Sequence, residues 1–393
     1  MRSKKSRSVV LIPWVWVLLS VPVGVEGQAR SAASRLQVSG GEVRLALSSV
    51  GGRRLVEVRV GNAGPYRFLI DTGSTMSIVD SGIASELGLL ATGTEKVGPP
   101  GGDTVEADVV AVPVLHVGSL TARGVPMVVL GLAGMTGGAI QGVLGMDLFE
   151  DVVLTLDASR EVAIVGRGSL SPDDPSVIRL DRTSEGVNFA MDVAGTRVPV
   201  HLDTGSPGGI TLPVDLMGRL PLSSDSSRRG TVGMVGGNRS VVTRQLRGVV
   251  RVGAVEYRDP QIAFLDPSPP SGNFGSQMTD GLVVTVDQRS GLLSLRRSEG
   301  AGPDPAPPPP AAAPRRLGVR FGGAGGSLSS VASVDPGSLG ERSGFRAGDV
   351  IVRLNGRPMA EYDVAALGDL IRGTTPLTWE IDRNGERVTI VVR

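Results

Sequence analysis

The sequence predicts a mostly β protein, with two similar β-rich halves followed by a small α+β domain. The phrase Asp-Thr-Gly-Ser occurs twice, at residues 71–74 and 203–206, and each copy follows an apolar run typical of a strand. Glycine (56 residues) and proline (27) are abundant and aromatic residues make up only 3%, which favours short strands and many turns over long helices. A proline- and alanine-rich stretch, residues 299–315, cannot join a packed core and therefore separates residues 316–393 as a domain.

The duplication extends beyond the repeated phrase. A hairpin over residues 55–70 leads into Asp71, and a similar hairpin over residues 188–202 leads into Asp203. Alternating apolar residues in both hairpins are typical of antiparallel strands with one buried face. Shorter echoes follow in the same order in each half: Gly142-Val143-Leu144-Gly145 and Thr155-Leu156-Asp157, then Gly272-Asn273-Phe274-Gly275 and Thr285-Val286-Asp287. Two copies of one structural unit explain these matches.

The segments between these landmarks have their own expected structure. Residues Ser81 to Leu90 are predicted to form a short helix. Two glycine-rich hairpins are expected at Glu95 to Asp108, with the tip at 98–102, and at Gly230 to Thr243, with the tip at 236–238. Each hairpin could fold over a cleft as a flap, and a loose surface loop explains each one equally well.

Composition excludes several kinds of site. The formal net charge is +1 and no basic cluster is interleaved with aromatic residues, so we expect no nucleic-acid partner. Two histidines and no cysteine leave no disulfide framework and no zinc site of ordinary type. The chain has no Gly-x-Ser-x-Gly motif, which disfavours serine catalysis, and its glycine runs lack the Gly-Lys pair of a phosphate loop. We therefore expect no metal and no cofactor.

The N-terminus has the pattern of a targeting segment. Basic residues between Arg2 and Arg7 precede an apolar run from Val9 to about Val25, and small residues follow as far as Gly27. The pattern predicts a signal peptide over residues 1–27 and an exported, periplasmic or secreted protein. An uncleaved membrane anchor is the alternative, but the run is short for a membrane span and contains two prolines.

The duplicated motifs resemble the pepsin-type bilobal aspartic peptidases, and more closely the bacterial branch whose lobes resemble retroviral proteases. The resemblance covers roughly residues 42–298 and implies two homologous β-barrel lobes, at 42–170 and 176–298. The family pattern places two apolar residues and a glycine opposite the active turn. Val143-Leu144-Gly145 matches this pattern, whereas Asn273-Phe274-Gly275 has a polar residue in the first position.

The resemblance implies that Asp71 and Asp203 form a catalytic dyad. Two carboxyl groups roughly 3 Å apart cannot both ionise, so they share one proton: the ionised member activates a water and the protonated member polarises the scissile carbonyl. By the same resemblance, the hydroxyls of Thr72 and Thr204 would cross-brace the two turns. The remaining residues of the motif would support the dyad, the serines by hydrogen bonds to the outer carboxylate oxygens and the glycines by allowing close approach of backbone amides: Ser74, Ser206, Gly73 and Gly205.

The C-terminal stretch, 316–393, resembles a bacterial PDZ domain. Residues 344–356 read as a turn, a strand and an Asn-Gly hairpin, Glu361 to Arg372 as a helix, and two more strands surround Asn384-Gly385. The family match implies that an extended peptide adds as a strand beside the segment at the carboxylate-binding loop. The residues implied in peptide binding are Leu317, Gly318, Val319, Arg320 and Phe321.

Two functions remain open from the sequence. The first is an exported aspartic-type endopeptidase with an Asp71/Asp203 dyad, in which the PDZ domain recruits substrates or partners through C-terminal or extended peptides. The second is a catalytically inactive extracytoplasmic scaffold that binds peptides. A lone Asp-Thr-Gly is more often a turn, but the symmetric duplication favours a dyad. Because both lobes lie in one chain, dimerisation is not needed, and we expect a monomer.

Other polar residues have simpler interpretations. His201 lies on the same strand face as Asp203 and could tune the dyad, but the pattern favours a hydrogen-bonded packing role. His116 is interpreted as a surface or structural residue. Asp157 and Asp287 stand at strand ends and are expected to form turns.

Overall fold

The structure is a computed structural model of the chain. The residues it describes are 14–16, 36–38, 40–99, 102, 104–132, 136, 138–182, 186–224, 228–234, 237–298, 317–321, 330–359, 367, 371 and 376–392. The chain divides into two compact units: Met1–Met135 with Ile140–Pro307, and Thr136–Ala139 with Pro308–Arg393. The fold is mostly β, as the sequence predicts, and we describe each unit by itself.

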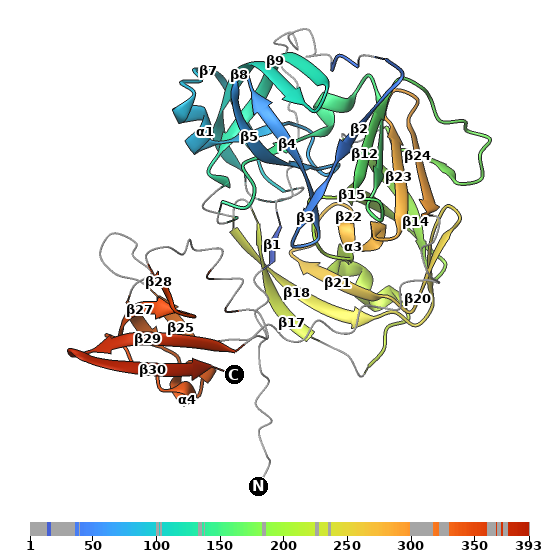
Figure 1. The fold of residues 1–393 in the computed structure, drawn as a ribbon. Helices are drawn as coiled ribbons and strands as arrows, with labels where there is room; N and C mark the ends of the chain where they lie inside the picture. The colour runs from blue at the N-terminus through green and yellow to red at the C-terminus, as the bar shows by residue number, and fades with distance from the viewer. Residues whose placement is uncertain are drawn as a thin grey trace. The chain divides into compact units, whose positions relative to one another are not determined.

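The first repeat (residues 42–170) is built on an eight-stranded sheet in the order β3-β4-β5-β10-β6-β9-β8-β7 (Figure 1). Strand β8 also pairs with β4, so the sheet curls back on itself. The bounds are β3 Ser48–Val50, β4 Arg53–Val60, β5 Ala63–Ile70, β6 Ile78–Asp80, α1 Ser81–Glu86, β7 Ala91–Val97, β8 Val105–Val117, β9 Leu120–Leu130, β10 Gly142–Leu144 and the 3-10 helix η1 Met146–Phe149.

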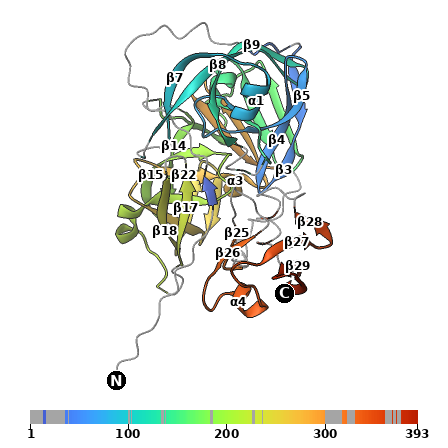
Figure 2. The same ribbon diagram turned by 90° about the vertical axis from the view of Figure 1, so that its left-hand side faces the viewer.

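The second repeat (residues 176–298) is built on a ten-stranded sheet in the order β1-β17-β18-β21-β16-β22-β15-β14-β19-β20, and Figure 2 shows β14, β15 and β22 side by side. Its first strand, β1 (Trp14–Trp16), comes from the predicted signal segment and pairs in parallel with β17. The other bounds are β14 Asn188–Val193, β15 Thr196–Asp203, β16 Ile210–Pro213, η2 Val214–Arg219, β17 Arg228–Met234, β18 Gly237–Gln245, β19 Val249–Val252, β20 Val255–Arg258, β21 Gln261–Asp266, β22 Gly272–Gly275 and α3 Ser276–Thr279.

The two sheets share one strand order. The run β4-β5-β10-β6-β9-β8-β7 in the first repeat corresponds to β14-β15-β22-β16-β21-β18-β17 in the second. The directions correspond too: β10 runs parallel to β5 and antiparallel to β6, and β22 runs parallel to β15 and antiparallel to β16. Each repeat therefore places its Asp-Thr-Gly-Ser turn at the end of the same strand, beside the same neighbour.

A third sheet joins the repeats, with the strand order β13-β24-β23-β11-β12-β2, and Figure 1 shows β2, β12, β23 and β24 along one side. At its centre β11 pairs with β23, and Thr155 stands directly opposite Thr285 with the two Oγ1 atoms 3.0 Å apart. These are the threonines of the repeated Thr-x-Asp echo, so the pseudo-twofold relation between the repeats passes between them. The bounds are β2 Glu42–Ala46, β11 Val153–Asp157, β12 Val162–Gly166, β13 Val177–Arg179, β23 Leu282–Asp287 and β24 Leu292–Arg297.

Apolar packing holds this unit together. One large cluster of buried residues runs through both repeats, and its side chains include Phe68, Phe149, Phe189 and Phe274. A smaller cluster lies within the first repeat, around Leu55, Leu69, Ile78 and Val143. Phe274 meets the rings of Phe189 and Tyr257 edge to face, at centroid distances of 5.8 and 5.9 Å. With no cysteine in the chain, these packed cores supply the stability.

The C-terminal unit is a small sheet domain with its own core. Its four-stranded sheet has the order β28-β27-β29-β30, and β25 pairs with β26 in a separate ladder (Figure 1). Trp379 is fully buried and its ring stacks on Phe321 at 5.5 Å. The bounds are β25 Val319–Phe321, β26 Val331–Val334, α4 Leu339–Ser343, β27 Val350–Leu354, β28 Arg357–Pro358, β29 Leu377–Arg383 and β30 Glu386–Val392.

Several local expectations can be compared with the structure. Asn355-Gly356 and Asn384-Gly385 adopt positive φ angles at both residues, as tight Asn-Gly hairpin turns require. The predicted helix from Ser81 is shorter than expected, because Leu87 ends α1. Parts of other predicted segments lie outside the described residues, namely most of residues 1–27, the stretch 299–315, the two hairpin tips at 100–101 and 235–236, and most of the helix from 361 to 372. In the part of the chain that is described, we find no helix long and apolar enough to cross a membrane.

Candidate active site

The two Asp-Thr-Gly-Ser turns meet at the contact between the repeats. Asp71 directly follows β5 and Asp203 ends β15, and both side chains are fully buried. Behind each turn lies the strand that carries the repeated glycines, β10 in the first repeat and β22 in the second. A charged side chain without solvent exposure is rare in proteins, and here there are two.

Thr72 and Thr204 lock the turns together. The Oγ1 atom of Thr204 accepts a hydrogen bond from the backbone N–H of Thr72 at 3.0 Å, and the Oγ1 atom of Thr72 accepts one from the N–H of Thr204 at 3.1 Å. Each hydroxyl then donates across the interface, Thr72 to the carbonyl of Leu202 at 2.9 Å and Thr204 to the carbonyl of Ile70 at 2.8 Å. This is the cross-brace that the family resemblance implies.

The glycines let the carboxyl groups approach. A Cβ atom added to Gly73 would lie 2.8 Å from Oδ1 of Asp203 and 3.0 Å from Oδ1 of Asp71, so one small group at that point would touch both carboxyl groups. A Cβ atom on Gly205 would lie 2.3 Å from Oδ2 of Asp71. Side chains are excluded at both positions, as the sequence predicts for residues that permit close approach.

The hydrogen bonds to the two carboxyl groups differ. Oδ1 of Asp71 accepts from the backbone N–H groups of Gly73 (2.8 Å) and Gly205 (3.1 Å), whereas its Oδ2 is buried and accepts none from the described residues. On Asp203, Oδ1 accepts from the N–H of Ser206 at 2.7 Å, and Oδ2 accepts from the side-chain amide of Asn273 at 2.5 Å. The pair is thus asymmetric even though the backbone around it is nearly symmetric.

Both carboxyl groups hold their protons more tightly than an exposed aspartate does. Burial raises the pKa of Asp71 well above its ordinary value, the negative charge of Asp203 raises it further, and a hydrogen bond between the two carboxyl groups adds to the effect. Burial also raises the pKa of Asp203, but His201, Asn273 and the N–H of Ser206 act in the opposite direction. Because the groups interact strongly, they titrate as a pair.

The serine hydroxyls do not contact the carboxylates, which corrects the expectation for Ser74 and Ser206. The hydroxyl of Ser74 donates to the carbonyl of Met76 at 2.6 Å, and the hydroxyl of Ser206 accepts from the N–H of Gly208. The reason is local, because a serine after Asp-Thr-Gly closes its own turn with the nearest backbone group. Ser206 still donates a hydrogen bond to Asp203, but from its backbone N–H.

Asn273 and His201 contact the turns directly. The sequence marks Asn273 as a departure from the family pattern, and the structure shows that its amide hydrogen-bonds Asp203. His201 packs with Nε2 3.0 Å from the carbonyl oxygen of Gly73 and with Nδ1 3.2 Å from Oδ1 of Asn188. The imidazole of the second repeat is thereby attached to the turn of the first.

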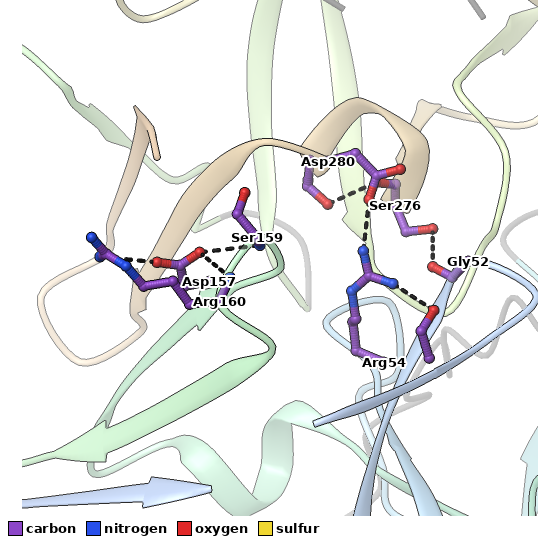
Figure 3. Close-up of polar contacts among 9 residues, drawn as sticks. Gly52, Arg54, Asp157, Ser159, Arg160, Ser276 and Asp280 are labelled. Carbon is purple, nitrogen blue, oxygen red and sulfur yellow. Dashed lines mark hydrogen bonds and ion pairs between the residues drawn. The ribbon is translucent and has the colours of Figure 1, made fainter. Parts of the chain in front are cut away.

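A hairpin of the first repeat also reaches the second turn. Arg53, at the start of β4, donates from Nε to the carbonyl of Gly205 at 2.8 Å. Burial lowers the pKa of Arg53, while the charges of Asp203 and Asp71 oppose that shift. Beside it, Arg54 pairs with Asp280 at 2.8 Å and the hydroxyl of Ser276 donates to the carbonyl of Gly52 at 3.1 Å (Figure 3). The tip of the β3–β4 hairpin is therefore fastened to helix α3.

A third carboxyl group, that of the half-buried Asp147, lies near the first turn. Oδ1 of Asp147 accepts from the hydroxyl of Ser77 at 2.9 Å, and the Ser77 oxygen accepts from the N–H of Gly145 at 3.1 Å. Burial raises the pKa of Asp147 to about 6, although these hydrogen bonds act against the shift. Asp147 thus supports the strand end beneath the turn of Asp71.

The remaining polar candidates are structural. Asp157 accepts from the N–H groups of Ser159 and Arg160 and pairs with the Arg160 guanidinium (Figure 3). Asp287 accepts from the N–H groups of Ser290 and Leu170, so both aspartates form turns as predicted. His116 contacts the hydroxyl of Thr121 at 3.1 Å, far along the sheet in the hairpin of β8 and β9. No group of three or more His, Asp and Glu side chains is placed to hold a metal ion among the residues described.

The candidate peptide-binding residues lie on strand β25. Within the described residues β25 pairs only with β26, which leaves its other edge without a strand. Leu317 packs into the core of the domain, and Gly318 has a positive φ of 64°. A Cβ atom on Gly318 would lie 2.3 Å from the Cβ atom of Ser338, so this loop requires glycine. Val319 and Phe321 pack against the same core, and the side chain of Arg320 lies outside the described residues.

Three residues of the site were not singled out from the sequence. Arg53 has no local signal, because only the folded hairpin brings it to Gly205. Asn188 and Thr211 could have been found by aligning the two repeats position by position, since each replaces an apolar residue of the first repeat on a strand beside β15 or β22.

Family models match two stretches of the chain. The aspartyl protease family matches residues 56–148, and the PDZ domain family matches residues 330–379. The first match includes Asp71 and ends before the second repeat, so it does not extend to Asp203. No curated protein matches the chain. Both matches confirm the resemblances drawn from the sequence: the chain carries an aspartyl protease segment of that family over residues 56–148 and a PDZ domain over residues 330–379.

Proposed function

We propose that the protein is an aspartic-type endopeptidase in which Asp71 and Asp203 share one proton and activate a water. One observation carries this proposal: two fully buried carboxyl groups, one from each repeat, lie so close together on a mutual threonine brace that a Cβ atom at Gly73 would touch both. Two carboxylates this close together repel each other strongly unless they share a proton. A structural turn gains nothing from such an arrangement.

The proposed chemistry follows from the arrangement of these groups. The ionised carboxylate takes a proton from the water, the water oxygen attacks the scissile carbonyl carbon, and the protonated carboxyl group gives its proton to the carbonyl oxygen. When the tetrahedral intermediate breaks, the amide nitrogen takes the proton from the first carboxyl group and leaves as an amine. The second carboxyl group recovers its proton from a hydroxyl of the intermediate, whose oxygen becomes the carbonyl oxygen of the new carboxylic acid. The backbone N–H groups of Gly73, Gly205 and Ser206 hold the carboxyl groups in place throughout.

The experiment uses the chain from residue 28 onward with an unfolded polypeptide as substrate. We expect Asp71→Asn and Asp203→Asn each to reduce cleavage by at least about a thousandfold while the circular dichroism spectrum stays unchanged. Asp173→Asn is the matched control, because Asp173 is exposed and its backbone N–H donates to Ser171, outside both turns. Full activity in either dyad variant would rule out the proposed mechanism.

The PDZ region favours a second candidate function, that of a peptide-binding scaffold whose lobes are inactive. The open edge of β25 supports docking of an extended peptide there, with residues 317–321 as the docking segment. The two functions differ in one measurement. A peptide mimic with a central hydroxyl in place of the scissile amide should raise the melting temperature of an active peptidase, and the dyad variants should lose this effect. Binding of peptides to residues 317–321 with no cleavage of a peptide library would favour the scaffold.

The location of the protein is part of the proposal. The basic and apolar pattern of residues 1–27 supports export followed by cleavage near Gly27. N-terminal sequencing of the protein purified from an expressing bacterium tests this directly. A mature chain that begins near residue 28 is expected, and a chain that keeps residues 1–27 in the membrane fraction would favour an anchor instead.

A further inference from the structure

The two repeats differ at four positions beside their turns, all of them buried in the first repeat and three of them buried in the second. In the first repeat, β10 places Val143 opposite Leu69 and Ile78, and Leu69 also stands opposite Leu55. In the second repeat, β22 places Asn273 opposite His201 and Thr211 in the same way, and His201 also stands opposite Asn188. We call the first group the apolar set and the second the polar set: Leu55, Leu69, Ile78 and Val143, against Asn188, His201, Thr211 and Asn273.

The polar set is a costly arrangement for a purely structural role. In the first repeat the apolar set forms part of a dry core cluster. In the second repeat Asn273, Thr211 and His201 are only 6%, 5% and 3% exposed. Burying a polar group without hydrogen bonds is unfavourable by roughly 1–3 kcal/mol, whereas the apolar set shows that the same backbone accepts aliphatic residues. The polar residues therefore serve something that the first repeat does not need.

Their contacts converge on Asp203. The amide nitrogen of Asn273 donates to Oδ2 of Asp203 at 2.5 Å, and the N–H of Ser206 donates to Oδ1 at 2.7 Å, so both oxygens accept from neutral donors. Thr211 stands opposite Asn273, and the Thr211 Oγ1 atom and the Asn273 Oδ1 atom are both buried without a hydrogen-bond partner among the described residues. If the Thr211 side chain rotates so that its hydroxyl donates to Oδ1 of Asn273, this bond keeps the amide nitrogen of Asn273 directed toward Asp203.

Asp71 has the opposite environment at one oxygen. Its Oδ1 accepts two backbone N–H groups, while its buried Oδ2 accepts none from the described residues. On the side of the first repeat, Val143 occupies the position of Asn273 and has no donor to offer. A proton on Asp71 would let this carboxyl group donate a hydrogen bond to the carboxylate of Asp203 beside it. A proton on either oxygen of Asp203 would weaken a hydrogen bond that already exists.

The charged groups around Asp203 act in the same sense. His201 lies two residues before it on β15, and each ring nitrogen of His201 faces an oxygen atom, the Gly73 carbonyl or Oδ1 of Asn188. Arg53 approaches from β4 and interacts with both carboxylates, with Asp203 more strongly than with Asp71. Together with Asp71 itself, these are the charged groups that face Asp203.

We infer that Asn273 and His201 are positioning residues that hold Asp203 as the carboxylate, so that the shared proton resides on Asp71. This inference rests on the proposed peptidase function for its catalytic meaning, and it makes Asp203 the group that takes a proton from water and Asp71 the group that donates to the substrate carbonyl. The directions of the pKa shifts agree, since His201 and Asn273 lower the pKa of Asp203, and Asp203 raises that of Asp71.

The ionisation order can be measured without any catalysis. In the chain from residue 28 with ¹³C-labelled aspartate carboxyl carbons, the resonances of the pair are assigned by their loss in Asp71→Asn and Asp203→Asn. As the pH rises from acid, we expect the carboxyl carbon of Asp203 to show deprotonation first and that of Asp71 to follow at higher pH. The reverse order in the unmodified chain would overturn the inference.

Exchanging residues between the repeats gives matched variants. Asn273→Val inserts the residue of the first repeat, and Val143→Asn places an amide beside Asp71. With Asn273→Val we expect the acid limb of the pH–activity profile, and the first NMR deprotonation, to move to higher pH by about one unit, because a hydrogen bond to the charged form is lost. The double exchange Asn273→Val with Val143→Asn should reverse the order in which the two carbons titrate. His201→Leu, with the residue found at position 69, should move the acid limb in the same direction as Asn273→Val.

The outcomes separate the inference from the proposed function. A chain that cleaves nothing, but whose Asp203 carbon deprotonates before that of Asp71, would remove the peptidase proposal and keep the ionisation order. A chain that cleaves with an acid limb unchanged by both Asn273→Val and His201→Leu, at normal circular dichroism, would overturn the inference and keep the peptidase. A loss of stability without any shift in pH dependence would show that these residues are only structural.

Discussion

Thr72 and Thr204 each complete the turn of the other: the hydroxyl oxygen of one accepts the backbone N–H of its counterpart, at 3.0 and 3.1 Å. The N–H groups of Thr72 and Thr204 find their hydrogen-bond acceptors only in the opposite turn, so each turn depends on the other repeat. The relationship ties the position of Asp71 to that of Asp203. Loss of either threonine hydroxyl would therefore disturb the contact between the two repeats.

Removing one hydroxyl should therefore destabilise the first unit. Thr72→Val and Thr204→Val keep the side-chain shape but leave a buried N–H and a buried carbonyl unpaired, and we expect each to lower the free energy of unfolding by about 1–3 kcal/mol. Because both residues belong to one network, the double variant should lose less than the sum of the two. Urea denaturation followed by far-UV circular dichroism measures these changes. Thr72→Ser keeps the hydroxyl and is the control, and strict additivity would argue against a shared network.

The glycines of the turns should tolerate no side chain. A Cβ atom at Gly205 would lie 2.3 Å from Oδ2 of Asp71, and one at Gly73 would lie 2.7 Å from Cγ of Asp203. We expect Gly205→Ala and Gly73→Ala to push the carboxyl groups apart, to lower the free energy of unfolding by about 1–3 kcal/mol and to abolish cleavage. Gly168→Ala is the control, because a Cβ atom there meets nothing within 4 Å. Melting temperatures equal to that of the control would show that the turns can relax.

The pH dependence of stability should report on Asp147. Its pKa is raised by burial from 3.8 to about 6, so its protonated form is favoured in the folded chain. The stability that this provides is complete below about pH 4 and is lost as the pH rises toward 6. Asp147→Asn stays neutral and should keep that stability, so it should exceed the unmodified chain by about 1–3 kcal/mol above pH 6 and converge with it near pH 4. Urea midpoints between pH 4 and pH 7 test this, and two parallel curves would contradict it.

In the C-terminal unit, Asp349 and Arg383 form a buried ion pair. Arg383 donates to the two carboxylate oxygens at 2.7 and 2.8 Å, and the N–H of Arg346 donates at 2.8 Å. Burial alone would raise the pKa of Asp349, but these hydrogen bonds outweigh it and lower the pKa. The pair should therefore stabilise the domain at neutral pH, and this stability should be lost as the pH falls below about 4.

Arg383→Met leaves the carboxylate buried without its partner, and we expect a loss of roughly 3 kcal/mol at pH 7 that becomes smaller in acid. Trp379 is the only tryptophan beyond residue 16, so in the chain from residue 28 its fluorescence follows this domain alone. Arg353→Met is the matched control, because Arg353 meets Glu380 at 4.0 Å with both side chains about half exposed, and such pairs contribute little. Equal effects of the two substitutions would show that the buried pair has no special role.

Sequence reasoning was most effective where the signal is local or repeated. Alternation predicted the strands of both repeats, Asn-Gly predicted the two hairpins at 355–356 and 384–385, and the duplicated phrase singled out Asp71 and Asp203. It failed for Ser74 and Ser206, whose hydroxyls take the nearest backbone partners in place of the carboxylates. It marked Asn273 only as a departure from the family pattern, whereas the structure shows that its amide donates a hydrogen bond to Asp203.

The chain by itself therefore determined the mostly β class, the internal repeat, the PDZ domain and the identity of the two central carboxyl groups. Periodicity and turn chemistry depend on a few neighbouring residues, so they can be recognised in the sequence alone. Which atom meets which across the turns was decided only by the tertiary structure. The exchange between Thr72 and Thr204, the reach of Arg53 to Gly205 and the polar surroundings of Asp203 depend on strand register and on the packing of two repeats. Most of those contacts join residues more than a hundred positions apart in the sequence, and no local sequence pattern predicts which of such distant residues will meet.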